Sequence, residues 1–204
     1  MRQAPQSALR SAAAILFRPR QTIRAIIDQD PTRCVILLAW LSGVAGTLGS
    51  ITVKASDREL PLAFYICLAI YLGPLIGFFH IYSGAALARL TGSWLGGGAT
   101  FAECRAAMAW GAMPLVCALP LWSIGLSVFG MALLRERSFG LSATLAILAT
   151  QLLLAVWALT LQVACTAEVH RFSMTRALLT AVLAWILFVG SLVALVLAAM
   201  ALDK

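Results

Sequence analysis

Charged residues are scarce in this chain of 204 residues: they make up 11% of it, whereas a soluble globular domain usually has about 25%. Hydrophobic residues make up 62% of the chain, and its mean hydropathy is +0.94. So little polar surface cannot cover a compact globule in water, which excludes a soluble domain. We therefore expect an integral membrane protein.

Paired cysteines and catalytic signatures are also missing. The five cysteines form no C-x-x-C pair and no regular spacing, which argues against a disulfide framework and against a zinc site. There is no G-x-S-x-G elbow and no H-E-x-x-H helix, and the glycine run at 96–98 lacks the Gly-Lys-Ser/Thr that a phosphate loop needs. We therefore expect no enzymatic activity, no cofactor and no bound metal.

Five hydrophobic stretches have the length that a membrane-spanning helix needs, roughly 20 residues. Short charged connections separate them and leave no room for a soluble domain. We predict an all-α polytopic membrane protein, in which residues 1–33 form a cytoplasmic amphipathic segment and 34–204 form one bundle of five transmembrane helices. The predicted spans are 34–53, 61–90, 106–134, 141–167 and 177–202.

Lysine and arginine predict the orientation. The N-terminal segment and the connections that follow the second and fourth spans hold ten of the 15 basic residues, and the opposite side holds five. The positive-inside rule then places the N-terminus in the cytoplasm and the C-terminus outside. The net charge of +7 has the same explanation. Because the basic residues punctuate hydrophobic runs and form no stripe, nucleic acid is not an expected partner.

The segment before the first span is amphipathic. Five apolar residues between Leu9 and Phe17 follow the i, i+3, i+4, i+7, i+8 pattern of one helical face, and isoleucines continue that face after Pro19. A short arginine-rich helix with one apolar face is expected to lie in the headgroup layer of the membrane. The alternative is that it packs on the cytoplasmic end of the bundle, and the two placements are compatible.

Three helix starts carry recognisable capping residues. Asp30-Pro31 offers a cap for the first span, Thr100 and Glu103 have the spacing of a capping box, and Ser173 can cap the fifth span. Within the first span, small residues share one face, which predicts close packing on another helix. These residues are Ala39, Gly43, Gly46, Thr47 and Ser50.

Three polar side chains inside the spans are candidates for function. His80 lies in the second span, and Gln151 and Gln162 share a face of the fourth. Membrane glutamines and histidines more often form hydrogen bonds with a neighbouring helix than bind a substrate. Prolines also interrupt the second and third spans, as they do in some transporters. A continuous polar cavity around these three side chains would favour transport, whereas tight packing would favour a structural role.

Three segments, in this order, resemble the Yip domain family, the Ypt/Rab-interacting five-span membrane proteins. They are Phe17-Arg-Pro-Arg to Asp30-Pro31, the glycine loop from Leu90 to Phe101 with Ala109-Trp110 and Pro114 after it, and Trp157 with His170-x-x-Ser173-x-x-x-Ala177. The resemblance implies a five-helix bundle with a cytosolic N-terminus. The short N-terminus and the alanine-rich composition are similar to the bacterial branch, which implies a bacterial inner membrane.

The resemblance brings no catalytic residues. Eukaryotic members engage small GTPases in vesicle trafficking, but their Asp-Leu-Tyr-Gly-Pro element is absent here, so GTPase binding is not expected. Two hypotheses remain open: a non-enzymatic protein that organises membrane or binds a lipid or protein partner at its cytoplasmic face, and a small transporter, channel or lipid-moving bundle that uses the kinked second and third helices.

Two connections on the basic side are the expected partner-binding surface, because loops on a rigid scaffold often carry binding residues. The candidates are Arg105, Glu168, His170, Arg171 and Arg176. We expect the arginines and the histidine to contact a partner or an anionic lipid headgroup, with Glu168 holding one arginine in place. The alternative is that these residues only cap helices and orient the chain. The sequence does not indicate the oligomeric state.

Overall fold

The computed structural model describes residues 8–54, 61–129 and 141–202, and within these ranges the chain forms helices and no strand. The predicted all-α helical bundle is therefore confirmed. Two short helices precede five long helical units, one of which is broken into three. The helices are α1 (Ala8–Phe17), α2 (Pro19–Gln29), α3 (Val35–Lys54), α4 (Leu62–Trp94), α5 (Phe101–Gly111), α6 (Met113–Cys117), α7 (Leu119–Phe129), α8 (Leu141–His170) and α9 (Met174–Leu202).

Four helical units are long and apolar enough to cross a membrane: Ala63–Trp94, Phe101–Val128, Thr144–His170 and Met174–Ala201. The apolar part of α3, Val35–Ser50, is shorter. Large hydrophobic side chains cover the outside of these helices, as expected when lipid rather than water surrounds them. The chain is a polytopic membrane protein.

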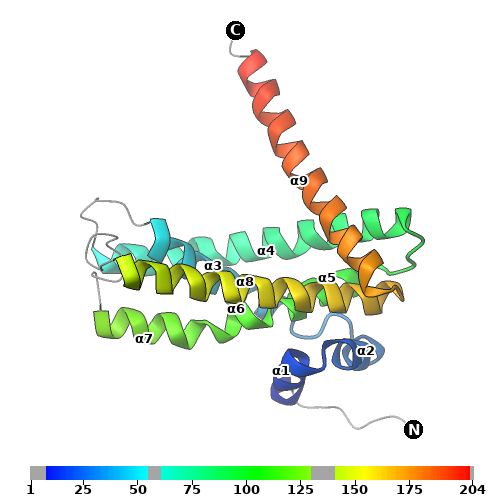
Figure 1. The fold of residues 1–204 in the computed structure, drawn as a ribbon, viewed down its shortest axis with the longest axis horizontal. Helices are drawn as coiled ribbons and strands as arrows, with labels where there is room; N and C mark the ends of the chain where they lie inside the picture. The colour runs from blue at the N-terminus through cyan, green and yellow to red at the C-terminus, as the bar shows by residue number, and fades with distance from the viewer. Residues whose placement is uncertain (1–7, 55–60, 130–140, 203–204) are drawn as a thin grey trace.

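The helices α3, α4, α5–α7 and α8 run side by side along the long axis of the molecule, and α1 and α2 lie beside them, with α2 near one end and α1 nearer the middle (Figure 1). The last helix, α9, starts at this same end and diverges from the other four. We call it the basic end because every arginine of the described ranges lies at or near it. These arginines are Arg10, Arg18, Arg20, Arg24, Arg33, Arg89, Arg105, Arg171 and Arg176.

Glycines bring α3 and α4 into backbone contact. A Cβ atom on Gly43 would overlap the carbonyl oxygen of Gly73, and a Cβ atom on Gly77 would overlap that of Ala39. Glycines four residues apart on α4 therefore seat against α3, which is the small-xxx-small packing typical of membrane helices. Because the two backbones approach so closely, a side chain at Gly43 or Gly77 has no room.

The small-residue face of α3 is narrower than predicted. Ala39, Gly43 and Thr47 are buried along one i, i+4 row, as expected. Gly46 and Ser50 are exposed, and a Cβ atom on Gly46 would meet nothing within 4 Å. Their inclusion in the packed face is wrong, because the contact with α4 follows the i±4 ridge of α3.

Prolines divide the third hydrophobic unit but not the second. The unit breaks at Ala112, two residues before Pro114, and again at Ala118, two residues before Pro120. Proline lacks the N–H that would bond to the carbonyl of residue i−4. Pro74, by contrast, lies inside the continuous helix α4.

The N-terminal segment consists of two helices that pack on the bundle. Arg18 separates them, and Pro19 occupies the first turn of α2. Ile15, Ile23 and Ile26 are buried in the same hydrophobic core as α3 and α5. The segment therefore makes the bundle contact that the sequence offered as an alternative, and its placement at the membrane surface stays a prediction.

The two predicted caps at the starts of α5 and α9 are confirmed. The amide of Thr100 donates to Glu103 Oε2 (2.7 Å), and the amide of Glu103 donates to Thr100 Oγ1 (3.3 Å). At the start of α9, the amide of Arg176 donates to Ser173 Oγ (3.4 Å). Each cap satisfies an amide at a helix start that would otherwise lack a partner.

Asp30 caps a turn and not a helix. Its carboxylate accepts hydrogen bonds from the amide (2.8 Å) and hydroxyl (2.6 Å) of Thr32, which lower the pKa of Asp30. The helix α3 begins only at Val35. The predicted cap of the first span is therefore wrong, because the carboxylate of Asp30 accepts its hydrogen bonds from the turn that links α2 to α3.

Candidate functional site

His170, the last residue of α8, lies inside the basic end and not on its surface. Its side chain is 4% exposed. The imidazole stacks on the ring of Phe172, with 5.1 Å between centroids and 13° between planes. Its Nε2 atom lies 3.5 Å from Cys104 Sγ on α5. The ring therefore connects α8 to α5 and is not positioned to contact a partner directly.

Glycines of the predicted loop enclose this imidazole. A Cβ atom on Gly92 or on Gly97 would overlap the ring of His170, and one on Gly97 would also overlap Phe172. The helix α4 ends in a Schellman motif, in which Gly96 has φ +86° and the Gly97 amide donates to the Gly92 carbonyl (2.9 Å). We call Gly92, Gly97 and His170 the glycine cradle.

The helix α8 also ends in a Schellman motif, but an arginine and not a glycine occupies its left-handed position. The amide of Phe172 donates to the Ala167 carbonyl (2.7 Å), and that of Arg171 donates to the Glu168 carbonyl (3.2 Å). Arg171 has φ +58°, a left-handed conformation that costs a non-glycine residue about 1–3 kcal/mol. Its side chain is exposed, so the strained turn presents a guanidinium outward.

Glu168 binds two arginines of the N-terminal segment. Arg20 Nε donates to Glu168 Oε2 (3.0 Å), and Arg24 Nε donates to Oε1 (3.1 Å). Arg24 Nη2 also donates to the Glu168 carbonyl (2.9 Å). The carboxylate thus joins α2 to the end of α8, and the arginines that it holds come from α2 and not from the predicted surface.

Arg105 and Arg176 differ in exposure. The guanidinium of Arg105 lies over the rings of Tyr82 (5.3 Å) and Phe101 (6.0 Å), and its Nε atom is buried without a hydrogen bond among the described residues. Arg176 lies on the first turn of α9 and is exposed. All five predicted surface residues therefore lie at the basic end, where Arg171 and Arg176 are the exposed members of the set.

The three intramembrane candidates separate into two environments. Gln151 Nε2 donates to the Gly49 carbonyl (2.6 Å), which is a contact between α8 and α3. His80 and Gln162 both line a cavity of about 630 Å³ between α4, α8 and α9. The structure brings His80 and Gln162 to one cavity and places Gln151 outside its lining.

Sequence reasoning missed the partners of two candidates. Arg20 and Arg24 contribute to the predicted orientation, but their contact with Glu168 was not predicted, although their i, i+4 spacing places both on one face of α2. Gly92 and Gly97 are part of the glycine loop that resembles the Yip domain family, but the sequence did not predict that they enclose the buried His170. The spacing of the arginines was a usable signal, whereas nothing local in the sequence connects the glycines with a residue more than 70 positions away.

The chemistry available at the basic end is anion binding. Guanidinium groups form short, often bidentate hydrogen bonds with phosphate and carboxylate oxygens. Within the three described ranges, no cluster of three His, Cys, Asp or Glu residues could hold a metal ion. The exposed arginines are therefore the groups of this site that are best suited to a ligand.

Comparison with known proteins agrees with this architecture. Residues 13–195 match the Yip1 domain. This match includes α2, the glycine cradle, the capping box and most of α9. No curated protein and no solved structure matches the chain. Because the match extends over nearly the whole chain, as the three ordered segments had indicated, the protein belongs to the Yip1 domain family.

Proposed function

We propose that this Yip-type membrane protein is not an enzyme and binds anionic phospholipid headgroups at its basic end. In this proposal the basic end faces the cytoplasm of a bacterial cell and the protein lies in the inner membrane. Arg171 and Arg176 contact the headgroup. Arg105 contributes positive charge behind them, and His170 and Glu168 hold the end of α8 in place.

The conformation of Arg171 is the observation that carries the proposal. A glycine occupies the left-handed position of the corresponding turn after α4, and it would fit this turn without strain. An exposed arginine at such a position costs stability, and strained residues of this kind concentrate at functional sites. An arginine at this strained position is explained if the protein needs its guanidinium group to bind a ligand.

The charge balance supports an anionic ligand. The described ranges place nine arginines but only four carboxylates at the basic end. Glu168 is occupied by Arg20 and Arg24, and Glu103 is occupied by its capping box. Phosphate oxygens of a headgroup would supply the acceptors that the side chains of Arg171 and Arg176 lack among the described residues.

Replacing Arg171 by glycine tests the proposal, because it removes the charge and keeps the turn. We expect Arg171→Gly to match or exceed the wild type in thermal stability and to bind phosphatidylglycerol more weakly. Arg176→Gln should weaken binding in the same direction. Retention of phosphatidylglycerol by the purified protein in mild detergent, counted by native mass spectrometry, measures the effect.

Arg18→Gln is the matched control, since Arg18 is also an exposed arginine of the basic end but lies at the junction of α1 and α2. It should leave retention unchanged. Equal losses for Arg18→Gln, Arg171→Gly and Arg176→Gln would mean that only total charge matters. Unchanged retention in the double variant of Arg171 and Arg176 would refute the site.

The alternative function, a small transporter or channel, would need a continuous polar path. His80 and Gln162 line a common cavity, but Gln151 bonds to the α3 backbone and is absent from the lining. Among the described residues, no Lys, Arg, Asp or Glu contributes to that lining. These observations favour a binding role over ion or proton transport.

A further inference from the structure

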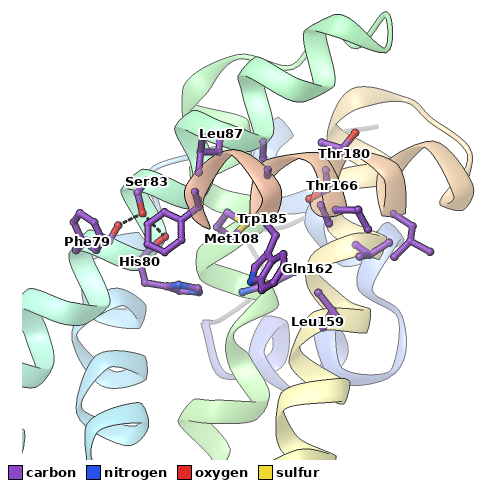
Figure 2. A pocket seen from close by; sticks show the side chains of 18 of the residues that line it. Phe79, His80, Ser83, Leu87, Met108, Leu159, Gln162, Thr166, Thr180 and Trp185 are labelled. Atoms are coloured by element: carbon purple, nitrogen blue, oxygen red, sulfur yellow. Dashed lines mark hydrogen bonds between the residues drawn. The ribbon is translucent and has the colours of Figure 1, made fainter. Parts of the chain in front are cut away.

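The cavity between α4, α8 and α9 has features of a binding site within the membrane. Its volume of about 630 Å³ falls in the range of roughly 300–1,000 Å³ that is typical of small-molecule sites. Figure 2 shows its lining side chains, which come from α4, α8 and α9, with Met108 of α5 behind them. The space exists because small residues line it, among them Gly84, whose missing side chain leaves room for the end of Met108.

The lining is apolar and uncharged. Its large side chains include Phe79, Leu159, Trp185 and Phe188, and no Lys, Arg, Asp or Glu of the described ranges lines it. An ionic ligand in such surroundings would lose its hydration without gaining an opposite charge. The chemistry of the walls therefore favours a ligand with an apolar chain and no net charge in the part that enters.

Three polar groups nevertheless point into this space. The imidazole of His80, the amide of Gln162 and the indole of Trp185 come from α4, α8 and α9, respectively, and are directed into the cavity (Figure 2). None of these side chains has a hydrogen bond with any described residue, whereas the hydroxyls of Ser83 and Thr180 bond to their own helices. A polar group that lacks a hydrogen-bond partner costs several kcal/mol of free energy when hydrocarbon surrounds it. These three groups are therefore expected to form hydrogen bonds with a ligand.

The entrance to the cavity is lateral. At the side nearer the basic end, Thr91 Oγ1 donates to the Thr180 carbonyl (3.1 Å) and ties α4 to α9. Farther along, α9 diverges from the bundle (Figure 1). Because α4, α8 and α9 all have the length and composition of membrane spans, the gap between them opens toward lipid and not toward water.

We propose that this cavity binds a glycerolipid molecule of the bilayer, with an acyl chain along the apolar walls and its ester carbonyls accepting hydrogen bonds from His80, Gln162 and Trp185. Indole N–H is a donor only, and imidazole and carboxamide groups also donate. The uncharged ester carbonyl oxygens of a glycerolipid can accept from these donors and introduce no charge. This site is separate from the headgroup-binding surface at the basic end.

A matched pair of glutamines on α8 provides the first test. Gln162→Leu removes a donor from the cavity, and Gln151→Leu removes one that bonds to α3 outside the cavity. In native mass spectra of protein purified in mild detergent, the wild type should retain one glycerolipid. Gln162→Leu should lower that retention about fivefold, as one lost hydrogen bond predicts, and Gln151→Leu should not. Equal retention in both variants would overturn the proposal.

Filling the cavity provides the second test. Ala184 lines it from α9, so Ala184→Phe should displace the lipid while the protein keeps its helix content and its phosphatidylglycerol binding at the basic end. Conversely, Arg171→Gly should leave the cavity lipid in place. The two variants therefore distinguish loss of lipid from the cavity from loss of headgroup binding at the basic end. A folded Ala184→Phe variant that still retains the lipid would refute the cavity site.

Photocrosslinking in native membranes tests the cavity site even if the lipid is lost during purification. A photoreactive residue at position 159, which lines the cavity, should give a lipid adduct in native membranes, whereas one at position 153, which is exposed on the same helix but outside the lining, should give much less. Equal adducts at both positions would indicate only general lipid contact. A product of twice the chain mass would mean that a second copy fills the cavity. Either result would overturn the proposal.

Discussion

The pair α3–α4 and the last helix, α9, show opposite ways in which a hydrophobic helix is covered. Glycines bring α3 and α4 into backbone contact. The helix α9 is the most apolar of the four long units, yet all of its residues from Gly190 to Ala201 are exposed. In a membrane, hydrophobicity alone does not bring helices together, since lipid tails are equally apolar. Small residues and polar contacts do so, and graded substitutions can test this difference.

The largest effect is expected at Gly43. A leucine there has to displace the backbone of Gly73 and Gly77, and overpacking of this kind costs about 1–3 kcal/mol or more. We expect Gly43→Leu to lower the thermal unfolding temperature in detergent strongly. Gly46→Leu is the control on the same helix, because a Cβ at Gly46 meets no neighbour. Similar losses for both variants would contradict the packing shown for α3 and α4.

A somewhat smaller effect is expected at the glycine cradle. Gly97→Ala should force His170 and Phe172 out of their stacked arrangement and cost about 2 kcal/mol. Gly98→Ala serves as the control, because a Cβ on Gly98 would meet nothing within 4 Å. Thermal unfolding monitored by circular dichroism compares the two. Equal stability of the Gly97→Ala variant and the wild type would show that the cradle is not close-packed.

The ion pairs between α2 and α8 should contribute less, because the side chains are 21–50% exposed. Glu168→Gln should destabilise the protein by about 1 kcal/mol or less, and its effect should shrink at high salt. Hydrogen exchange in α2 should accelerate. Asp28→Asn changes the same charge on the exposed side of α2 and should leave exchange unchanged. If both variants behave alike, Glu168 does not hold α2 on the bundle.

The smallest effect is expected at the start of α9. Ser173→Ala removes a cap with a long hydrogen bond of 3.4 Å and should cost about 0.5–1 kcal/mol. Ser191→Ala, in the exposed part of the same helix, should be close to neutral, since Ser191 Oγ only donates to the Phe188 carbonyl. Unfolding temperatures in the same detergent measure both. A larger loss for Ser191→Ala would mean that the distal part of α9 is packed.

The sequence predicted the helical bundle and its connections because hydrophobic length and helix capping are local properties. The capping box of Thr100 and Glu103 is an example, since two residues three positions apart suffice to define it. The partner of Gly43 was not predictable in this way, because Gly73 lies 30 positions farther along and many small residues could have met it. The prediction that Gly46 packs against another helix is wrong for the same reason. Helical periodicity identifies the residues that share a face, but it does not show which of them a crossing helix contacts.

For the site, the sequence indicated the end of the bundle but not the role of each residue. The exposed position of Arg171 and Arg176 follows from their place at helix ends. The burial of His170 does not follow, because it depends on glycines contributed by another helix end. The convergence of His80 and Gln162 on one cavity likewise depends on the divergence of α9, which no local pattern encodes.

The contacts of Glu168 and His170 impose an order on how the protein is made. Ribosomes synthesise chains from the N-terminus, so α1, α2 and the glycine loop are made before the end of α8. Until that end is synthesised, Arg20 and Arg24 lack the carboxylate that binds them, and Gly92 and Gly97 lack the ring that they enclose. The N-terminal helices therefore gain their contacts with α8 only after four of the five hydrophobic units have been synthesised, although their apolar contacts with α3 and α5 can form earlier. In a nascent chain stalled before residue 168, α2 should therefore be less protected from proteases than in the full chain.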